Sequence, residues 1–205
     1  MKHPGINLGA HHGEAHDQAE TLAFGFWVFL MSDLIIFGLM FATYVTMVNP
    51  VGMAGGPGPK DVFDLTSVFT QTMILLTSSL TFGVASLAMR HEQGHSRISL
   101  WLVVTLALGL GFLILEARDF ASMLSMDARP SRSGFLSAFW GLVPLHGLHV
   151  STGCIWIVMM LVQMRIFGMI PIVKTRLLRL GLFWHFLDLI WIAIFTIVYL
   201  AGLST

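Results

Sequence analysis

Five long apolar segments, separated by short polar stretches, constrain this chain more than any other feature of its sequence. A bilayer core about 30 Å thick is crossed by a helix of roughly 20 apolar residues. Segments of this kind run over residues 24–48, 66–89 and 98–115, within 134–164, and over 180–203. The sequence therefore predicts an all-α fold, a polytopic membrane helix bundle with five transmembrane helices.

The composition agrees with a membrane protein and excludes several other classes. Only 11% of the 205 residues are charged and 56% are hydrophobic, whereas soluble domains carry about 25% charged residues. The formal net charge is zero, so nothing indicates nucleic acid as a partner. The single cysteine, Cys154, can form neither an internal disulfide nor a Cys-based metal site by itself.

We expect one transmembrane domain, residues 23–205, preceded by a polar, His-bearing cytoplasmic tail, residues 1–22. His11, His12 and His16 in this tail could bind a transition metal, but the composition favours a solvated, flexible segment.

The Lys and Arg residues predict which way the chain crosses the membrane. With a cytoplasmic N-terminus and the C-terminus on the other side, seven lie on the cytoplasmic side and four opposite, in agreement with the positive-inside rule. The seven are Lys2, Arg90, Arg97, Arg165, Lys174, Arg176 and Arg179, and the four are Lys60, Arg118, Arg129 and Arg132.

Six ionisable side chains fall inside the expected spans or at their ends, where burial costs at least about 2.5–3.5 kcal/mol each. They are the candidates for a buried polar network or a lipid cleft: Asp33, Glu116, His146, His149, His185 and Asp188. Two of the pairs, His146/His149 and His185/Asp188, are spaced three residues apart and so share a helix face. We therefore expect spans four and five each to turn a polar stripe inward, with His–Asp or His–Glu hydrogen bonds across helices.

The histidines have two interpretations. They could ligate haem, copper or a di-metal site. They could instead be hydrogen-bonded inside the bundle and orient its helices, which is the interpretation that we favour. The histidine spacing typical of bis-His haem sites is absent, and Cys154 lies off the His146/His149 spacing, so we expect no metal and no catalytic residue in this chain.

Three segments resemble subunit III of the haem–copper respiratory oxidases. They are GFWVFLMSD in the first span, RSGFLSAFWGLVPLHGLHVSTG leading into the fourth, and LFWHFLDLIWIAIFTIVYLAG in the fifth. The five-span form and the His-bearing tail resemble the quinol-oxidising, cytochrome bo-type branch. The acidic residue after Ser32 is Asp33 where the family commonly has Glu, and the family's E-x-x-E pattern is similar to Glu116-Ala-Arg-Asp119 here.

The resemblance implies an accessory, non-catalytic subunit of a proton-pumping ubiquinol oxidase of the respiratory electron-transport chain. Haem and copper would belong to the catalytic subunit I, and subunit II, a small subunit IV and bound phospholipid would be the other partners. The chain would support assembly, lipid binding and sustained turnover.

Other functions stay open at this point. The chain could be subunit III of a cytochrome c oxidase or of a nitric oxide reductase, or a stand-alone haem- or metal-binding membrane protein. A proton-coupled transporter using Asp33 and Asp188 fits less well, because no internal repeat is visible.

Overall fold

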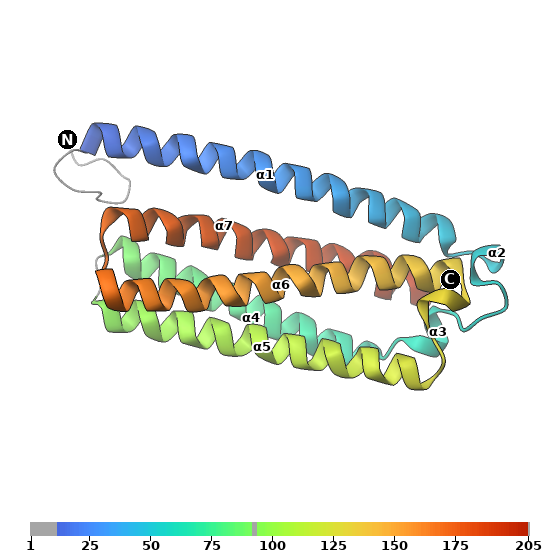
Figure 1. The fold of residues 1–205 in the computed structure, drawn as a ribbon. Coiled ribbons are helices and arrows are strands. Elements are labelled where there is room, and N and C mark those ends of the chain that lie inside the picture. The colour runs from blue at the N-terminus through green and yellow to red at the C-terminus, as the bar shows by residue number, and fades with distance from the viewer. Residues whose placement is uncertain (1–11, 92–93, 205) are drawn as a thin grey trace.

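The structure, a computed structural model, describes residues 12–91 and 94–204, and within these ranges it contains helices and no strand. Five long helices run side by side as a bundle (Figure 1): α1 (His12–Met47), α4 (Leu65–Arg90), α5 (His95–Ser125), α6 (Gly134–Phe167) and α7 (Pro171–Ile194). Each of them contains a stretch long and apolar enough to cross a membrane. The prediction of an all-α bundle with five spans is confirmed.

Short helical elements lie between the long helices and at the end of the chain. They are α2 (Pro50–Met53), α3 (Pro59–Val62), the 3-10 turn η1 (Pro130–Arg132), the π-helical η2 (Phe195–Leu200) and α8 (Ala201–Ser204). Because η2 follows α7 without a break, the fifth span reaches from Pro171 to Leu200.

Two boundaries differ from those expected. The third span was expected to end at residue 115, but α5 continues to Ser125. The fifth was expected to begin at residue 180, but α7 begins at Pro171, where proline fits the first helical position. In both cases the extra turns carry polar or basic side chains, which a helix tolerates where it leaves the hydrocarbon.

The N-terminal tail is partly helical. Helix α1 begins at His12 and so includes a portion of the tail expected over residues 1–22. Residues 1–11, and with them His11, lie outside the described part of the chain, as do the side chains of His12 and His16.

Side-chain caps fix where three helices begin. Asn49 accepts a hydrogen bond from the Gly52 amide at 2.7 Å at the start of α2, and Asp64 accepts one from Thr66 at 2.9 Å at the start of α4. Ser133 accepts one from Leu136 at 3.1 Å at the start of α6. Each cap satisfies an amide that has no partner within its own helix.

Two tryptophans connect α7 to α4. The indole of Trp184 donates to the Ser78 hydroxyl and that of Trp191 to the Thr72 hydroxyl, each at 3.1 Å. Trp184 also lies against Gly109 of α5, where an added Cβ would come within 2.8 Å of its ring. The indole therefore needs a glycine there to reach the backbone of α5.

Helix α1 has a smaller share of its residues buried in the bundle than the other spans. Within its span it buries Leu30, Asp33, Phe37 and Tyr44, which lie along one face of the helix. The helix contacts mainly α6 and α7. One of its four buried side chains is therefore a carboxylate that faces α6.

Candidate functional site

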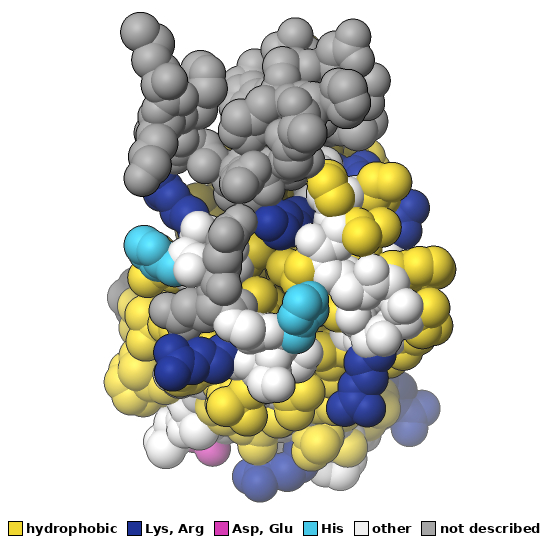
Figure 2. Space-filling model, turned by 90° about the vertical axis from the view of Figure 1, so that its left-hand side faces the viewer, with side chains coloured by type: hydrophobic (Ala, Val, Ile, Leu, Met, Phe, Trp, Pro, Cys, Tyr) yellow, Lys and Arg dark blue, Asp and Glu magenta, His cyan; other side chains and the backbone are white. Residues whose placement is uncertain are grey.

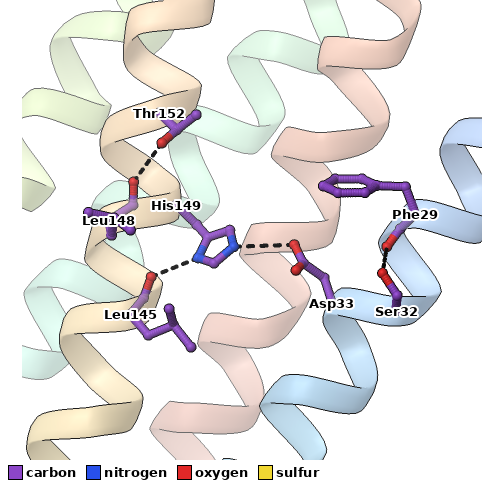
Figure 3. Close-up of polar contacts among 7 residues, drawn as sticks. All are labelled: Phe29, Ser32, Asp33, Leu145, Leu148, His149 and Thr152. Carbon is purple, nitrogen blue, oxygen red and sulfur yellow. Dashed lines mark hydrogen bonds and ion pairs between the residues drawn. The ribbon is translucent and has the colours of Figure 1, made fainter.

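A carboxylate–imidazole pair joins α1 to α6 in the membrane-spanning part of the bundle. The Asp33 Oδ2 atom lies 3.2 Å from His149 Nε2, and the two side chains are 11% and 20% exposed. Figure 3 shows the imidazole lying between Asp33 and the carbonyl of Leu145, which is 2.7 Å from its Nδ1 atom. The ring also packs against Phe37, with a centroid separation of 5.4 Å.

The surroundings of His149 assign the roles of its two ring nitrogens. A carbonyl oxygen can only accept, so Nδ1 donates a hydrogen to Leu145. Nε2 is therefore the nitrogen that faces the Asp33 carboxylate. The 3.2 Å distance is that of an ion pair when the imidazole is protonated, although the alignment does not meet the angular requirements of a hydrogen bond.

His146, one helical turn earlier on α6, has a different environment. It is fully buried, and its Nε2 atom lies 3.1 Å from the Leu187 carbonyl of α7, to which it donates. The ring lies against Phe112 and Trp191, and Nδ1 has no hydrogen-bond partner. His146 thus joins α6 to the backbone of α7, where an acidic side chain was expected.

The polar pair of α7 faces α4 and not α6. His185 lies on the outside of the bundle, where its Nδ1 atom is 2.7 Å from the Ser79 hydroxyl of α4. Asp188 is 8% exposed and lines a groove between α4 and α7. Among the described residues no hydrogen bond joins the side chains of these two residues to His146 or His149. The expected mutual network of spans four and five is therefore wrong, because the fifth stripe faces α4.

Glu116 belongs to a second polar cluster, between α4 and α5. It is 5% exposed, its carboxylate packs against Gly147 of α6, and its Oε1 atom has no hydrogen-bond partner. One turn later, Asp119 accepts hydrogen bonds from Ser67 at 2.8 Å and Gln71 at 2.6 Å. A cavity of about 50 Å³ borders both carboxylates, which is room for a few water molecules.

Sequence reasoning missed the polar partners on α4. Ser79 binds the candidate residue His185, and Ser67 and Gln71 bind Asp119, one turn from the candidate Glu116. Thr72 and Ser78 accept hydrogen bonds from the two tryptophans of α7. The signal was present, because α4 is the span with repeated hydroxyl and amide side chains, TSVFTQTMILLTSSLTF. Such side chains bind across helices in membranes.

The structure separates the six candidate residues into distinct places. Asp33 and His149 meet, His146 binds a backbone carbonyl, His185 and Asp188 face α4, and Glu116 borders the small cavity. In the part of the chain that the structure describes, no three His, Cys, Asp or Glu side chains are grouped as metal ligands.

Comparison with known proteins shows a family relationship over nearly the whole chain. Residues 5–203 match the family described as Cytochrome c oxidase subunit III. A cytochrome bo(3) ubiquinol oxidase subunit 3 from Pseudomonas aeruginosa is 44% identical over 195 residues, which cover 95% of this chain and 92% of the relative. One from Pseudomonas putida is 44% identical over 91% of this chain and 89% of its own length. A quinol oxidase subunit 3 from Bacillus subtilis is 38% identical over 88% and 87%.

The order of the motifs, the five spans and these matches all indicate the same family. The predicted resemblance to subunit III of the respiratory oxidases is confirmed. This chain belongs to the cytochrome c oxidase subunit III family and is an accessory subunit of an oxidase complex.

Proposed function

We propose that this chain is subunit III of a proton-pumping, cytochrome bo-type ubiquinol oxidase in a bacterial inner membrane. The observation that carries the proposal is the 44% identity, over 95% of this chain, to a subunit named for ubiquinol oxidation. The complex would reduce oxygen to water with electrons from ubiquinol. Haem and copper would lie in subunit I, and subunit II and a small subunit IV would complete the assembly.

In this proposal the chain carries no redox centre and supports turnover through its polar pair. Asp33 and His149 place a carboxylate beside an imidazole between two helices at membrane depth, and chains of such side chains form proton relays in membranes. An ionisable pair of this kind can exchange its proton with a neighbouring subunit without moving the helices that carry it. The pair would buffer proton uptake by the catalytic subunit and keep α1 attached to α6.

A groove between α5 and α6 supports the proposal that the chain binds phospholipid. It has a volume of about 630 Å³ and combines His95, Ser96 and Arg165 at one end with Leu100 and Val103 below them. The basic and hydroxyl-bearing side chains at one end could bind a phosphate head group, and the apolar side chains below them could contact an acyl chain.

The proposed orientation places this end of the bundle in the cytoplasm. Figure 2 views the end and shows Lys and Arg side chains distributed around it. Arg90, Arg97, Arg165 and Lys174 belong to the helix ends and links found here. At the opposite end, Arg129 and Arg132 lie 3.2 and 3.7 Å from Asp127, which offsets part of their charge.

The proposed role of the pair is tested in the intact complex with Asp33→Asn and His149→Gln. The initial rate of ubiquinol oxidation should fall modestly, and activity should decay faster over many turnovers than in the unaltered complex. Asp127→Asn, which removes an exposed carboxylate outside the pair, is the matched control and should behave as the unaltered complex does. Decay that is identical in all four proteins would contradict a role for the pair.

The electron donor distinguishes this proposal from its nearest rival. The matching family is described by cytochrome c oxidation, so a complex containing this chain could use cytochrome c instead. Ubiquinol-dependent oxygen consumption, with none from reduced cytochrome c, is the expected result. The reverse result would replace the proposed donor and leave the family assignment intact.

A further inference from the structure

Three polar side chains meet in a groove on the outer surface of the bundle. Ser79 of α4 binds His185 of α7 at 2.7 Å, and the same serine contacts Asp188 one turn further along α7. Asp188 is 8% exposed and lines the groove. Its Oδ1 atom is covered by the chain itself, so only the remaining exposed part of the carboxylate lies beside the imidazole in the groove.

These groups lie near the middle of the membrane. Asp188 lies eight residues, about 12 Å at 1.5 Å per residue, beyond residue 180, where the apolar part of α7 begins, and Ser79 is close to the midpoint of the second span, Leu65–Arg90. Lipid head groups do not reach this depth, and acyl chains offer no hydrogen-bond partner. Ionisable side chains at this depth face protein or an aqueous cavity, since hydrocarbon is a costly environment for them. The groove is therefore covered by something other than lipid tails.

The shape of the groove fits a closely approaching helix. Its volume is about 460 Å³, and apart from the polar residues it is lined by Leu76, Leu80, Gly83, Val84 and Leu87. Gly83 lies one turn from Ser79, and a Cβ added to it would meet nothing within 4 Å. Small residues four apart let the backbone of a second transmembrane helix come near, and here they border the Asp188 carboxylate.

We propose that this α4–α7 groove is the docking site for a transmembrane helix of a partner oxidase subunit. That helix carries a hydrogen-bond donor at mid-membrane depth, which reaches Asp188, and apolar side chains that pack over Ser79 and Gly83. This docking site rests on one part of the proposed function, namely that the chain is assembled with other oxidase subunits. It does not depend on which electron donor the complex uses.

A photo-reactive side chain placed in the groove tests this directly. Leu80 borders the groove and is 69% exposed, and Ile114 of α5, equally exposed, is the matched control on another face. In the intact complex, a benzoyl-phenylalanine at position 80 should cross-link to another oxidase subunit, and cleavage mapping should place the link within one of its transmembrane helices. Cross-links from position 80 only to lipid, or only to a second copy of this chain, would overturn the proposal.

A bulky substitution provides an independent test. Gly83→Leu should lower the recovery of partner subunits with the affinity-tagged chain about tenfold, the effect of roughly 1.4 kcal/mol at an interface. Gly111 of α5 has the same open space around it, so Gly111→Leu controls for added bulk on a membrane helix and should leave recovery unchanged. Equal recovery with both variants would overturn the proposal. Because Gly83 has no neighbour to clash with inside the chain, the amount of chain inserted in the membrane should be normal in both.

The two proposals fail in different ways. The position of the cross-link reports only on the docking site, whereas the substrate oxidised by the purified complex reports only on the proposed function. A link from position 80 to a subunit of a complex that oxidises cytochrome c would support the docking site and contradict the quinol assignment.

Discussion

Removing either member of the Asp33–His149 pair should weaken the attachment of α1 to the rest of the chain. At the 3.2 Å separation of Oδ2 and Nε2, two unit charges attract by about 5 kcal/mol at an effective dielectric constant of about 20, which is an upper bound on their interaction. Polar interactions between membrane helices average about 0.6 kcal/mol and reach about 1.7 kcal/mol when measured. We expect a coupling energy near the upper end, about 1–2 kcal/mol, because both side chains are largely buried.

The coupling is measured with Asp33→Asn, His149→Phe and the double variant in the purified complex. Asparagine preserves the size of the acid, and phenylalanine preserves a ring beside Phe37. The readout is the temperature at which this chain is released from the complex, followed by native electrophoresis. Each single variant should lose about 2 kcal/mol, a drop of roughly 4–8 °C for a chain of this size. The double variant should lose little more than either single one.

An additive result would contradict this reasoning. If the drop for the double variant equals the sum of the two single drops within about 0.5 kcal/mol, the two side chains do not interact. The contact between α1 and α6 would then rest on apolar packing alone.

Three further predictions concern packing and topology. Gly109→Ala should lower the release temperature, since its Cβ would come within 2.8 Å of the Trp184 ring and such overpacking costs about 1–3 kcal/mol. Gly38→Ala, with nothing within 4 Å, should raise the release temperature slightly or leave it unchanged, and equal drops for both would argue against the tight fit. Tyr44→Phe should cost about 1–2 kcal/mol, because a buried carbonyl of η2, 3.1 Å from the hydroxyl, loses its donor; a release temperature equal to that of the unaltered complex would count against this bond. A periplasm-specific reporter fused after Thr205 should be active, whereas activity of a cytoplasmic reporter there would reverse the proposed orientation.

The fold was predictable because length and apolarity decide membrane spans. The ends of the helices were less predictable from the sequence. Polar turns, such as those around Asp119 of α5 and Arg176 of α7, continue a helix beyond its apolar part. Composition alone does not distinguish such a turn from a loop.

The sequence predicted the types of residue at the site but not all of their partners. Hydrogen bonds between histidine and acid across helices were expected, and Asp33 instead lies at ion-pair distance from His149 without the alignment of a hydrogen bond. Which way α7 turns its polar pair could not be read from the sequence, because in a bilayer the lipid-facing and protein-facing sides of a helix are similarly apolar. The hydroxyl-rich face of α4, with Ser79 beside His185, carried the missing information.

Comparison of the purified oxidase with and without this chain tests most directly whether it is an accessory subunit free of redox centres. Haem and copper content, the initial rate of quinol oxidation, and activity over many turnovers should be followed in both preparations. Without the chain we expect unchanged haem and copper per catalytic subunit, a modest loss of initial rate, and faster inactivation. Stoichiometric loss of haem or copper together with the chain would mean that the chain holds a redox centre. Immediate and complete loss of activity in a haem-replete complex that lacks the chain would mean that the chain is not an accessory subunit.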